Sequence, residues 1–367
     1  MNREGKKVAA AGVTLNVLDE GQGPAVLLLH GFPDSGHLWR HQVPALKEAG
    51  YRVIVPDQRG FGLSDRPQDV KLYHRDLLVA DAVALLDASG VEQAALVTHD
   101  WGAAIGWQLA ERHPQRFTCQ VAMSVGPLPA MRACTDIRQR EMSWYTLFFQ
   151  YAGVAEKALA QDDWRLFREW ARHHPEAGHW IADLSREGAL TAGLNWYRAN
   201  SAMTITQPWV VRVPTLGLWS DGDAFLTEEQ MITAGRHVDA EWRYERVEGA
   251  SHWMMLDRSQ HLNRLLLNLL QRPHCTKGCA SPLRDRESPP KRGTPWQVVQ
   301  ASADGCSAVF AAALRAVLRG VLVFAGLRTC SPSAGGEIAA SPDAVSFACN
   351  AASAGTRLNR WRCSANR

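Results

Sequence analysis

The first 272 residues of this 367-residue sequence contain only two cysteines, Cys119 and Cys134. A disulfide framework needs several cysteines and is typical of secreted proteins. This region therefore indicates neither a disulfide framework nor secretion. The single C-x3-C pair of the chain, Cys275 and Cys279, lacks the second pair that a zinc site needs. We therefore expect a cytoplasmic protein that binds no metal and no cofactor.

Long uninterrupted apolar segments and a basic excess are also missing. The longest apolar stretch, residues 308–327, contains Arg315 and Arg319, and two arginines cost roughly several kcal/mol in a membrane-spanning helix. The N-terminus begins MNREGKK and has no apolar core of signal-peptide length. The net charge is only +3, so the chain has little excess positive charge with which to neutralise the phosphates of a nucleic acid. We expect no membrane span and no nucleic-acid partner.

The charge that is present divides the chain into two unequal regions. Residues 273–367 contain 12 Lys/Arg against 5 Asp/Glu, together with six of the eight cysteines. Residues 1–272 contain 28 basic and 32 acidic residues. The C-terminal region is rich in Pro, Ser, Gly and Ala, a composition typical of segments that cannot form a packed core. We predict that residues 273–367 form a low-complexity, disordered extension.

Short apolar runs alternate with helical patterns in the first part of the chain. The runs at residues 25–30, 52–57 and 94–99 have no polar alternation, which is typical of strands buried on both faces. Residues 38–49 and 73–86 carry apolar residues at helical spacing. This alternation predicts an α/β fold with a mostly parallel, doubly wound sheet.

A helical insertion divides this α/β core. Residues 128–206 contain no strand-like run, and residues 207–272 return to the earlier pattern. We therefore predict a first core segment at 1–127, a helical cap at 128–206 and a second core segment at 207–272. A cap in this place covers the carboxyl ends of the strands, where such sheets bind ligands. The cap holds five of the 14 tryptophans: Trp144, Trp164, Trp170, Trp180 and Trp196.

The strongest candidate for chemistry is Asp100, which stands in T-H-D-W-G (98–102) between a predicted strand and a predicted helix. A nucleophile at the apex of such a sharp turn needs small neighbours two residues away on either side. Gly102 meets this need, whereas Thr98 is larger than the usual glycine. The alternative interpretation is that Asp100 caps the following helix, because aspartate is a favoured N-cap residue.

Possible partners for Asp100 follow the last two strands. His252 lies in G-A-S-H-W after the final strand, in a predicted loop of small residues. Asp221 and Asp223 both follow the preceding strand. We favour Asp223 as the acid that orients His252, since it lies further beyond the strand, and expect Asp221 to bond the turn.

The turn after the first buried strand, H-G-F-P (30–33), adds a third element. In folds with a strand–nucleophile–helix turn, this position supplies one N–H group of an oxyanion hole, and the residue after the nucleophile supplies the other. Phe32 and Trp101 are the predicted main-chain donors. A plain Gly/Pro turn is the simpler alternative, but it leaves the coincidence with Asp100 unexplained.

Together, H-G-F-P, D-Q-R-G-F-G-x-S-D-R-P, H-D-W-G-A and G-A-S-H-W resemble the epoxide hydrolase and haloalkane dehalogenase branch of the α/β-hydrolase superfamily. The resemblance covers about residues 8–272. It implies an α/β-hydrolase fold with an inserted helical cap. The chain order of nucleophile, acid and histidine also agrees with this superfamily.

An aspartate nucleophile has a chemical consequence of its own. Attack on an acyl carbon makes a reactive mixed anhydride, whereas attack on an sp3 carbon makes an ordinary ester that activated water can hydrolyse. The substrate should therefore carry an electrophilic alkyl carbon with a leaving group. A halide leaves without a proton, but an epoxide oxygen needs a general acid.

The cap favours the epoxide. Residues 143–150 and 194–198 resemble the cap segments that bear the ring-opening tyrosines of epoxide hydrolases, and those tyrosines are then Tyr145 and Tyr197. Simple aromatic packing is the alternative for both. The resemblance further implies that Phe32, Trp101 and Trp196 line the substrate site. We expect an epoxide hydrolase that converts a small apolar epoxide and water to a vicinal diol through an ester on Asp100.

Two other functions remain open from sequence. A haloalkane dehalogenase uses the same nucleophile, and Trp101 is similar to a halide donor of that family, but Phe32 stands where its second donor is often Asn. Fluoroacetate dehalogenases carry an arginine where Trp101 stands. A non-catalytic ligand-binding homologue is the other alternative, favoured only by Thr98 and the unusual C-terminal region.

Overall fold

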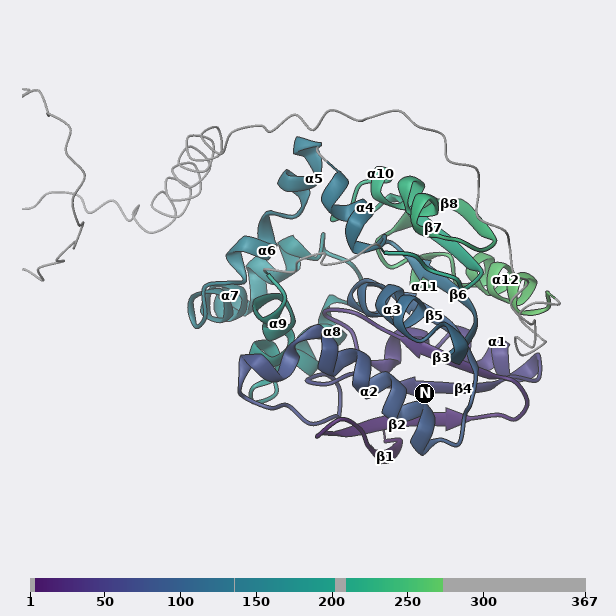
Figure 1. The fold of residues 1–367 in the computed structure, drawn as a ribbon. Helices are drawn as coiled ribbons and strands as arrows, with labels where there is room; N and C mark the ends of the chain where they lie inside the picture. The colour runs from purple at the N-terminus through teal and green to yellow at the C-terminus, as the bar shows by residue number, and fades with distance from the viewer. Residues whose placement is uncertain (1–3, 135, 202–208, 273–367) are drawn as a thin grey trace, which may run out of the picture. The chain divides into compact units, whose positions relative to one another are not determined.

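The computed structural model describes residues 4–134, 136–201 and 209–272 (Figure 1). The predicted extension at 273–367 lies outside these residues, as do residues 202–206 of the predicted cap and residues 207–208 of the predicted second core segment. Within the described part of the chain, no helix is long and apolar enough to cross a membrane.

One sheet of eight strands runs through the described residues, in the order β1-β2-β4-β3-β5-β6-β7-β8. β1 and β2 are antiparallel to their neighbours, and all other neighbours pair in parallel. The sheet therefore is mostly parallel, with an antiparallel edge. Its strands are β1 (Lys6–Ala9), β2 (Thr14–Glu20), β3 (Ala25–Leu29), β4 (Arg52–Pro56), β5 (Ala94–His99), β6 (Phe117–Met123), β7 (Thr215–Gly222) and β8 (Trp242–Ser251).

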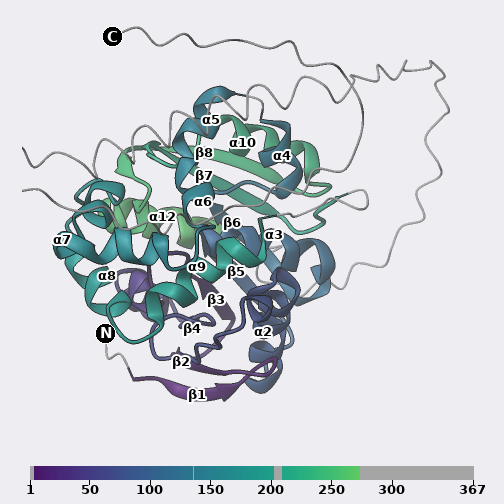
Figure 2. The same ribbon diagram turned by 90° about the vertical axis from the view of Figure 1, so that its left-hand side faces the viewer.

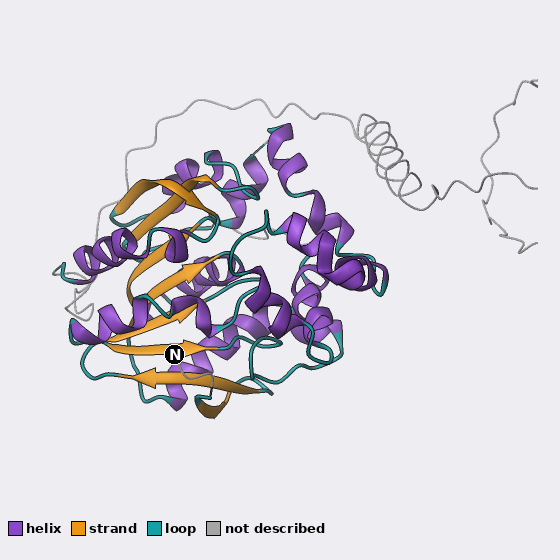
Figure 3. Ribbon diagram, turned by 180° about the vertical axis from the view of Figure 1, so that it is seen from behind, coloured by secondary structure: helices purple, strands orange, loops and turns teal. Residues whose placement is uncertain are grey.

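Helices cover both faces of the sheet, which explains why the central strands are continuously apolar (Figures 1 and 3). On one face, α2 (Arg75–Ala88) contacts α3 (Trp101–Arg112). On the other, α1 (Gln42–Glu48) contacts α12 (Ser259–Leu270). Every residue of β5 is buried between these layers. The three apolar runs predicted as buried strands are confirmed as β3, β4 and β5.

The helix predicted at 38–49 is wrong in detail. The structure has a 3-10 helix at Gly36–Trp39 and then α1 from Gln42. Pro44 is the third residue of α1, a position where its missing N–H group costs no helical hydrogen bond. The helix therefore begins close to this proline. The helix predicted at 73–86 is confirmed as α2, shifted by two residues, and only Tyr73 belongs to the preceding 3-10 helix, Val70–Tyr73.

The last strand is longer than its apolar pattern indicates. β8 extends to Ser251, so the small residues before His252 belong to the strand and not to a loop. After an irregularity in register, Gly222 of β7 pairs with Ser251. Backbone pairing with β7 thus carries the strand beyond Val247, where the apolar pattern ends.

Between β6 and β7, all regular elements of the described residues are helices, and we call residues 128–199 the cap. In Figure 3 the arrowheads of the central strands point towards the cap helices, and Figure 2 shows α7, α8 and α9 from the cap side. The cap helices are α4 (Leu128–Ala133), α5 (Ile137–Met142), α6 (Trp144–Phe148), α7 (Val154–Trp170), α8 (Ala177–Leu184) and α9 (Ala189–Ala199). Four short helices remain: η3 (Pro114–Arg116) precedes β6, α10 (Glu229–Ile232) and η4 (Thr233–His237) lie between β7 and β8, and α11 (Met254–Asp257) follows β8.

Candidate active site

Asp100 occupies a sharp turn between β5 and α3. Its backbone has φ 53° and ψ −121°, a conformation that non-glycine residues rarely adopt and that is frequent at nucleophile turns. The turn needs glycine at position 102, since a Cβ there would lie 2.2 Å from the carbonyl oxygen of Leu29.

Thr98, the larger residue of this turn, is accommodated by a gap in α3. Its Oγ1 donates a hydrogen bond to the carbonyl oxygen of Val121 at 2.9 Å. A Cβ at Gly106 would lie only 2.7 Å from Thr98 Cγ2. The absence of a side chain at Gly106 therefore makes the room that a glycine at position 98 would otherwise provide.

The Asp100 carboxylate faces the H-G-F-P turn. The main-chain N–H of Phe32 donates to Asp100 Oδ1 at 2.9 Å. A Cβ at Gly31 would lie 2.1 Å from the same oxygen, so glycine is required for this approach. The side chain makes no capping hydrogen bond to α3. The helix-cap interpretation of Asp100 is therefore wrong.

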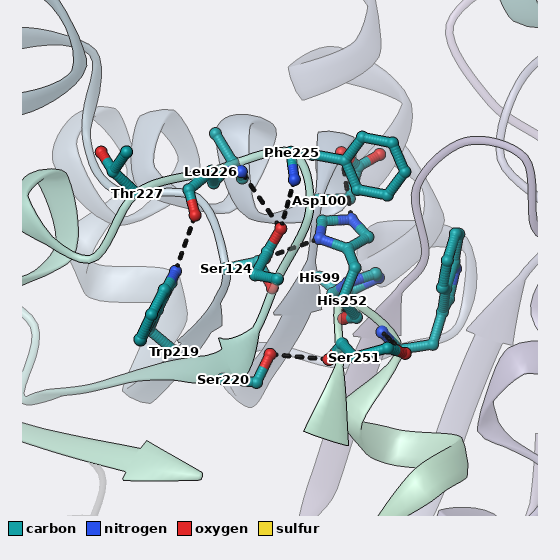
Figure 4. Close-up of polar contacts among 12 residues, drawn as sticks. His99, Asp100, Ser124, Trp219, Ser220, Phe225, Leu226, Thr227, Ser251 and His252 are labelled. Carbon is teal, nitrogen blue, oxygen red and sulfur yellow. Dashed lines mark hydrogen bonds and ion pairs between the residues drawn. The ribbon is translucent and has the colours of Figure 1, made fainter. Parts of the chain in front are cut away.

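His252 lies between two carboxylates (Figure 4). Its Nδ1 is 2.8 Å from Asp223 Oδ2, and its Nε2 is 3.7 Å from Asp100 Oδ2. All three side chains are buried. The structure thus brings the nucleophile, histidine and acid predicted from three separate segments into one cluster.

The charges around His252 dominate its protonation. Burial by itself lowers the pKa of this histidine, but the charges and hydrogen bonds of Asp223 and Asp100 outweigh burial and raise the pKa to about 10. At neutral pH the free protein therefore holds an imidazolium between the two carboxylates.

Backbone groups hold Asp223 in place. Its Oδ1 accepts hydrogen bonds from the N–H groups of Phe225 at 2.9 Å and Leu226 at 3.1 Å, which leaves Oδ2 for the histidine (Figure 4). Asp221, the competing acid, accepts a bond from Gly249 N at 2.8 Å instead. Two acids only two residues apart therefore face different partners.

Tyr145 and Tyr197 come together from α6 and α9, with ring centroids 5.9 Å apart. Tyr197 also contacts Trp101 at 5.1 Å and Phe32 at 5.7 Å. Burial, followed by the charge of Asp100, raises the pKa of both tyrosines well above the ordinary value. Both hydroxyls therefore stay protonated and able to donate at neutral pH.

Residues 24–259 match the sequence model of the family described as "alpha/beta hydrolase fold", which is more than half of the chain. The chain belongs to the α/β-hydrolase family.

Individual relatives of this α/β-hydrolase are known. It is 32% identical to Epoxide hydrolase A of Mycobacterium tuberculosis over 311 residues, covering 71% of this chain and 94% of that protein. It is 33% identical to the AB hydrolase superfamily protein YfhM of Bacillus subtilis, covering 71% and 95%. The crystal structure of Epoxide Hydrolase A from Mycobacterium thermoresistibile is similar with a TM-score of 0.64 at 32% identity, covering 72% and 97%.

Aromatic side chains surround the cluster in this α/β-hydrolase. Phe225 contacts the ring of His252 at 5.0 Å and Tyr145 at 5.6 Å. Trp196, predicted to line the substrate site, is fully buried and donates its indole N–H to the carbonyl oxygen of Arg59 at 2.9 Å. It packs against Trp101 at 5.8 Å. Other rings that close the site are Phe32, Phe149 and Trp170.

Two histidines with structural contacts to the site were not predicted. His99 Nε2 lies 2.9 Å from the carbonyl oxygen of His252. Burial lowers the pKa of His99 well below its ordinary value, so the ring is neutral and donates this bond. His30 Nε2 accepts from Gln58 N at 3.0 Å. His99 is the last residue of β5 and His30 directly follows β3, so each stands just before a motif residue, Asp100 or Gly31, and this position was the available signal.

No group of three or more His, Cys, Asp or Glu side chains within the described segments is arranged to hold a metal ion.

Proposed function

We propose that this α/β-hydrolase is an epoxide hydrolase, which converts an apolar epoxide and water to a vicinal diol. The main support is the position of the Asp100 carboxylate. Its Oδ1 accepts a hydrogen bond from Phe32 N, and its Oδ2 lies 3.7 Å from His252 Nε2. The names of its relatives from two Mycobacterium species support the same reaction. The aromatic lining supports an apolar substrate.

In the first step, Asp100 Oδ2 attacks an epoxide carbon from the side opposite the ring oxygen. The carbon–oxygen bond breaks, and the oxygen takes a proton from the hydroxyl of Tyr145 or Tyr197. The raised pKa of both tyrosines keeps them protonated until the alkoxide, a far stronger base, develops. The products are an alkyl ester on Asp100 and one tyrosinate.

Ester formation prepares His252 for the second step. The Asp100 charge is one of the causes that raise the pKa of this histidine. Esterification removes that charge, so the pKa of His252 falls, the imidazolium passes its Nε2 proton to the tyrosinate, and Nε2 becomes available as a base. Asp223 continues to hold Nδ1–H. The histidine therefore becomes a general base at the stage at which one is needed.

In the second step, His252 takes a proton from water, and the resulting hydroxide attacks the ester carbonyl carbon of Asp100. The negative charge develops on Oδ1, where Phe32 N–H donates and Trp101 N–H is the second proposed donor. Collapse releases the diol and regenerates the carboxylate. The proton taken from water stays on His252 and restores the imidazolium, so the cycle balances as epoxide plus water to diol.

The test uses styrene oxide and a simple bromoalkane with the wild-type protein, Asp100→Ala and His252→Gln. We expect diol from the wild type, none from Asp100→Ala, and in His252→Gln an adduct on Asp100 heavier by one substrate mass. Retained steady-state diol formation in Asp100→Ala would reject the mechanism. Bromide release without diol formation would instead identify a haloalkane dehalogenase.

An isotope measurement separates an ester mechanism from direct attack of water on the epoxide. In a single turnover in H2(18)O, the proposed ester delivers an oxygen of Asp100 to the diol, and the labelled oxygen enters the Asp100 carboxylate. Labelled diol in that first turnover contradicts the ester intermediate.

A further inference from the structure

Asp34 is a buried carboxylate that the proposed reaction does not use. It follows the Phe32–Pro33 turn, and both of its oxygens accept hydrogen bonds from neutral indole N–H groups. Trp180 Nε1 donates to Oδ1 at 2.7 Å, and Trp253 Nε1 donates to Oδ2 at 3.0 Å. Burial raises the pKa of Asp34 to about 7, and this pKa also responds to the charges of Asp100 and His252. Burying a carboxylate away from water costs folding free energy, so the presence of Asp34 at this position calls for a structural or functional reason.

The two tryptophans come from different parts of the molecule. Trp180 lies on α8 of the cap, whereas Trp253 directly follows His252 in the core. Their indole rings contact each other at 4.4 Å, and the ring of Trp253 contacts that of His252 at 5.3 Å. Asp34 therefore joins the cap to the residue next to the proposed base.

A second contact reaches the other neighbour of His252. His174, in the cap between α7 and α8, lies 3.2 Å from Asp257 Oδ1. Asp257 Oδ2 in turn accepts from Ser251 N at 2.7 Å. His174 also stacks on Trp180 at 5.1 Å. The cap thus contacts Trp253 directly and Ser251 through Asp257, on the two sides of His252.

We propose that Asp34 is a positioning residue: by holding the indoles of Trp180 and Trp253 together, it fastens α8 to the segment that carries His252 and thereby sets the position of that histidine for ester hydrolysis. The inference rests on the proposed function. Asp34 touches no reacting atom in this scheme. It acts on His252 through Trp253.

Comparing the rates of ring opening and of ester hydrolysis distinguishes a positioning role of Asp34 from a general contribution to the stability of the fold. Ring opening depends on Asp100 and the tyrosines, whereas ester hydrolysis depends on His252. A displaced histidine slows the second step, so the alkyl ester accumulates while epoxide consumption in the first turnover keeps its rate. A loss of folded protein lowers both steps in the same proportion.

The experiment compares Trp253→Phe, Trp180→Phe and Asp34→Asn in the full chain. Each tryptophan variant removes one N–H group and keeps an aromatic ring. Asp34→Asn keeps one acceptor oxygen and places an NH2 group against the other indole. The matched control is Trp39→Phe, because Trp39 is fully buried and its Nε1 has no hydrogen-bond partner among the described residues.

Rapid-quench mass spectrometry follows the ester on Asp100 after mixing with styrene oxide. We expect Trp253→Phe and Asp34→Asn to slow ester hydrolysis by about tenfold, the effect of one hydrogen bond to a charged group, with ring opening unchanged. Trp180→Phe should have a smaller effect that disappears in the Asp34→Asn background. Trp39→Phe should behave as the wild type.

Wild-type ester hydrolysis in Trp253→Phe and Asp34→Asn overturns the inference, as does an equal loss in both steps. If the wild type forms no ester at all, the proposed function itself fails, which is a different result. Indole N–H resonances of protein labelled with 15N-tryptophan give a readout independent of activity. Those of Trp180 and Trp253 should both move in Asp34→Asn, and no movement also overturns the inference.

Discussion

Asp100, Asp223 and His252 each directly follow a strand of the sheet, whereas Tyr145 and Tyr197 lie on two helices of the cap. In the core, backbone N–H groups hold the carboxylates: Phe32 donates to Asp100, and Phe225 donates to Asp223. In the cap, rings packed at 5 to 6 Å hold the tyrosines. Hydrogen bonds from backbone N–H groups position the core carboxylates, and packing against aromatic rings positions the cap tyrosines.

This difference assigns the two regions to different steps. The core groups are positioned for the charge changes of ester formation and hydrolysis, and the cap places two hydroxyls opposite them. Substitutions of Asp223 or His252 in the core should therefore cause the ester to accumulate, whereas substitutions of the cap tyrosines should prevent its formation. The following predictions test that division, beginning with the largest effect.

Asp223→Asn should lower turnover by roughly 10³–10⁴-fold, because the amide cannot stabilise the His252 imidazolium and favours the wrong tautomer. The ester should accumulate on Asp100, as intact-protein mass spectrometry can show. Asp221→Asn is the matched control, since Asp221 bonds Gly249 at the edge of the site, and its turnover should stay close to that of the wild type. Equal losses in the two variants would contradict the role of Asp223.

The double variant Tyr145→Phe/Tyr197→Phe should slow ring opening by roughly 10²–10⁴-fold through loss of the general acid. No ester should accumulate, because formation becomes the slow step. Pre-steady-state consumption of epoxide measures this rate. Tyr151→Phe is the control, since this cap tyrosine is 56% exposed. Ester accumulation in the double variant would remove the distinction between the two regions.

The pH dependence of stability should reveal the charged core. The pKa of His252 is raised to about 10 in the folded protein. Its contribution to the free energy of unfolding is therefore fully present below the unfolded pKa of about 6.5 and is lost as the pH rises through 10. Relative to His252→Gln, the wild type should lose on the order of a few kcal/mol between these pH values. Urea unfolding at several pH values tests this, and a pH-independent difference would contradict it.

The smallest effect concerns packing behind the nucleophile. Gly106→Ala places a Cβ 2.7 Å from Thr98 Cγ2 and should lower the free energy of unfolding by about 1–3 kcal/mol. Adding Thr98→Gly removes the contact, so the double variant should be more stable than the sum of the two single effects predicts. Chemical denaturation measures all three, and strict additivity would show that the two residues do not interact.

Much of the fold could be predicted because it depends on local patterns. Continuous apolar runs identified β3, β4 and β5, and small residues beside Asp100 identified the sharp turn. The end of β8 could not be predicted, since Gly249–Ser251 has no strand pattern and is extended by pairing with β7. The division of the 38–49 helix depended on where the chain turns before Pro44.

The site residues that belong to a sequence motif could be predicted. Those whose role depends on contacts between distant segments could not. The order of Asp100, Asp223 and His252 was visible because each follows a strand, and parallel strands end at the same edge of a sheet. The role inferred for Asp34 was not visible, although it stands beside H-G-F-P. Its two partners lie 146 and 219 residues away, and no local pattern indicates that both indoles turn towards it.

By itself, the sequence determined the class of fold, the kind of nucleophile and the candidate residues, because hydrophobic periodicity and turn chemistry are local properties of a chain. The tertiary structure decided which acid faces His252, how Gly106 makes room for Thr98, and which cap residues contact the segment around the histidine. Those outcomes depend on distances between segments far apart in the chain, and only the packing of the cap and the sheet sets these distances.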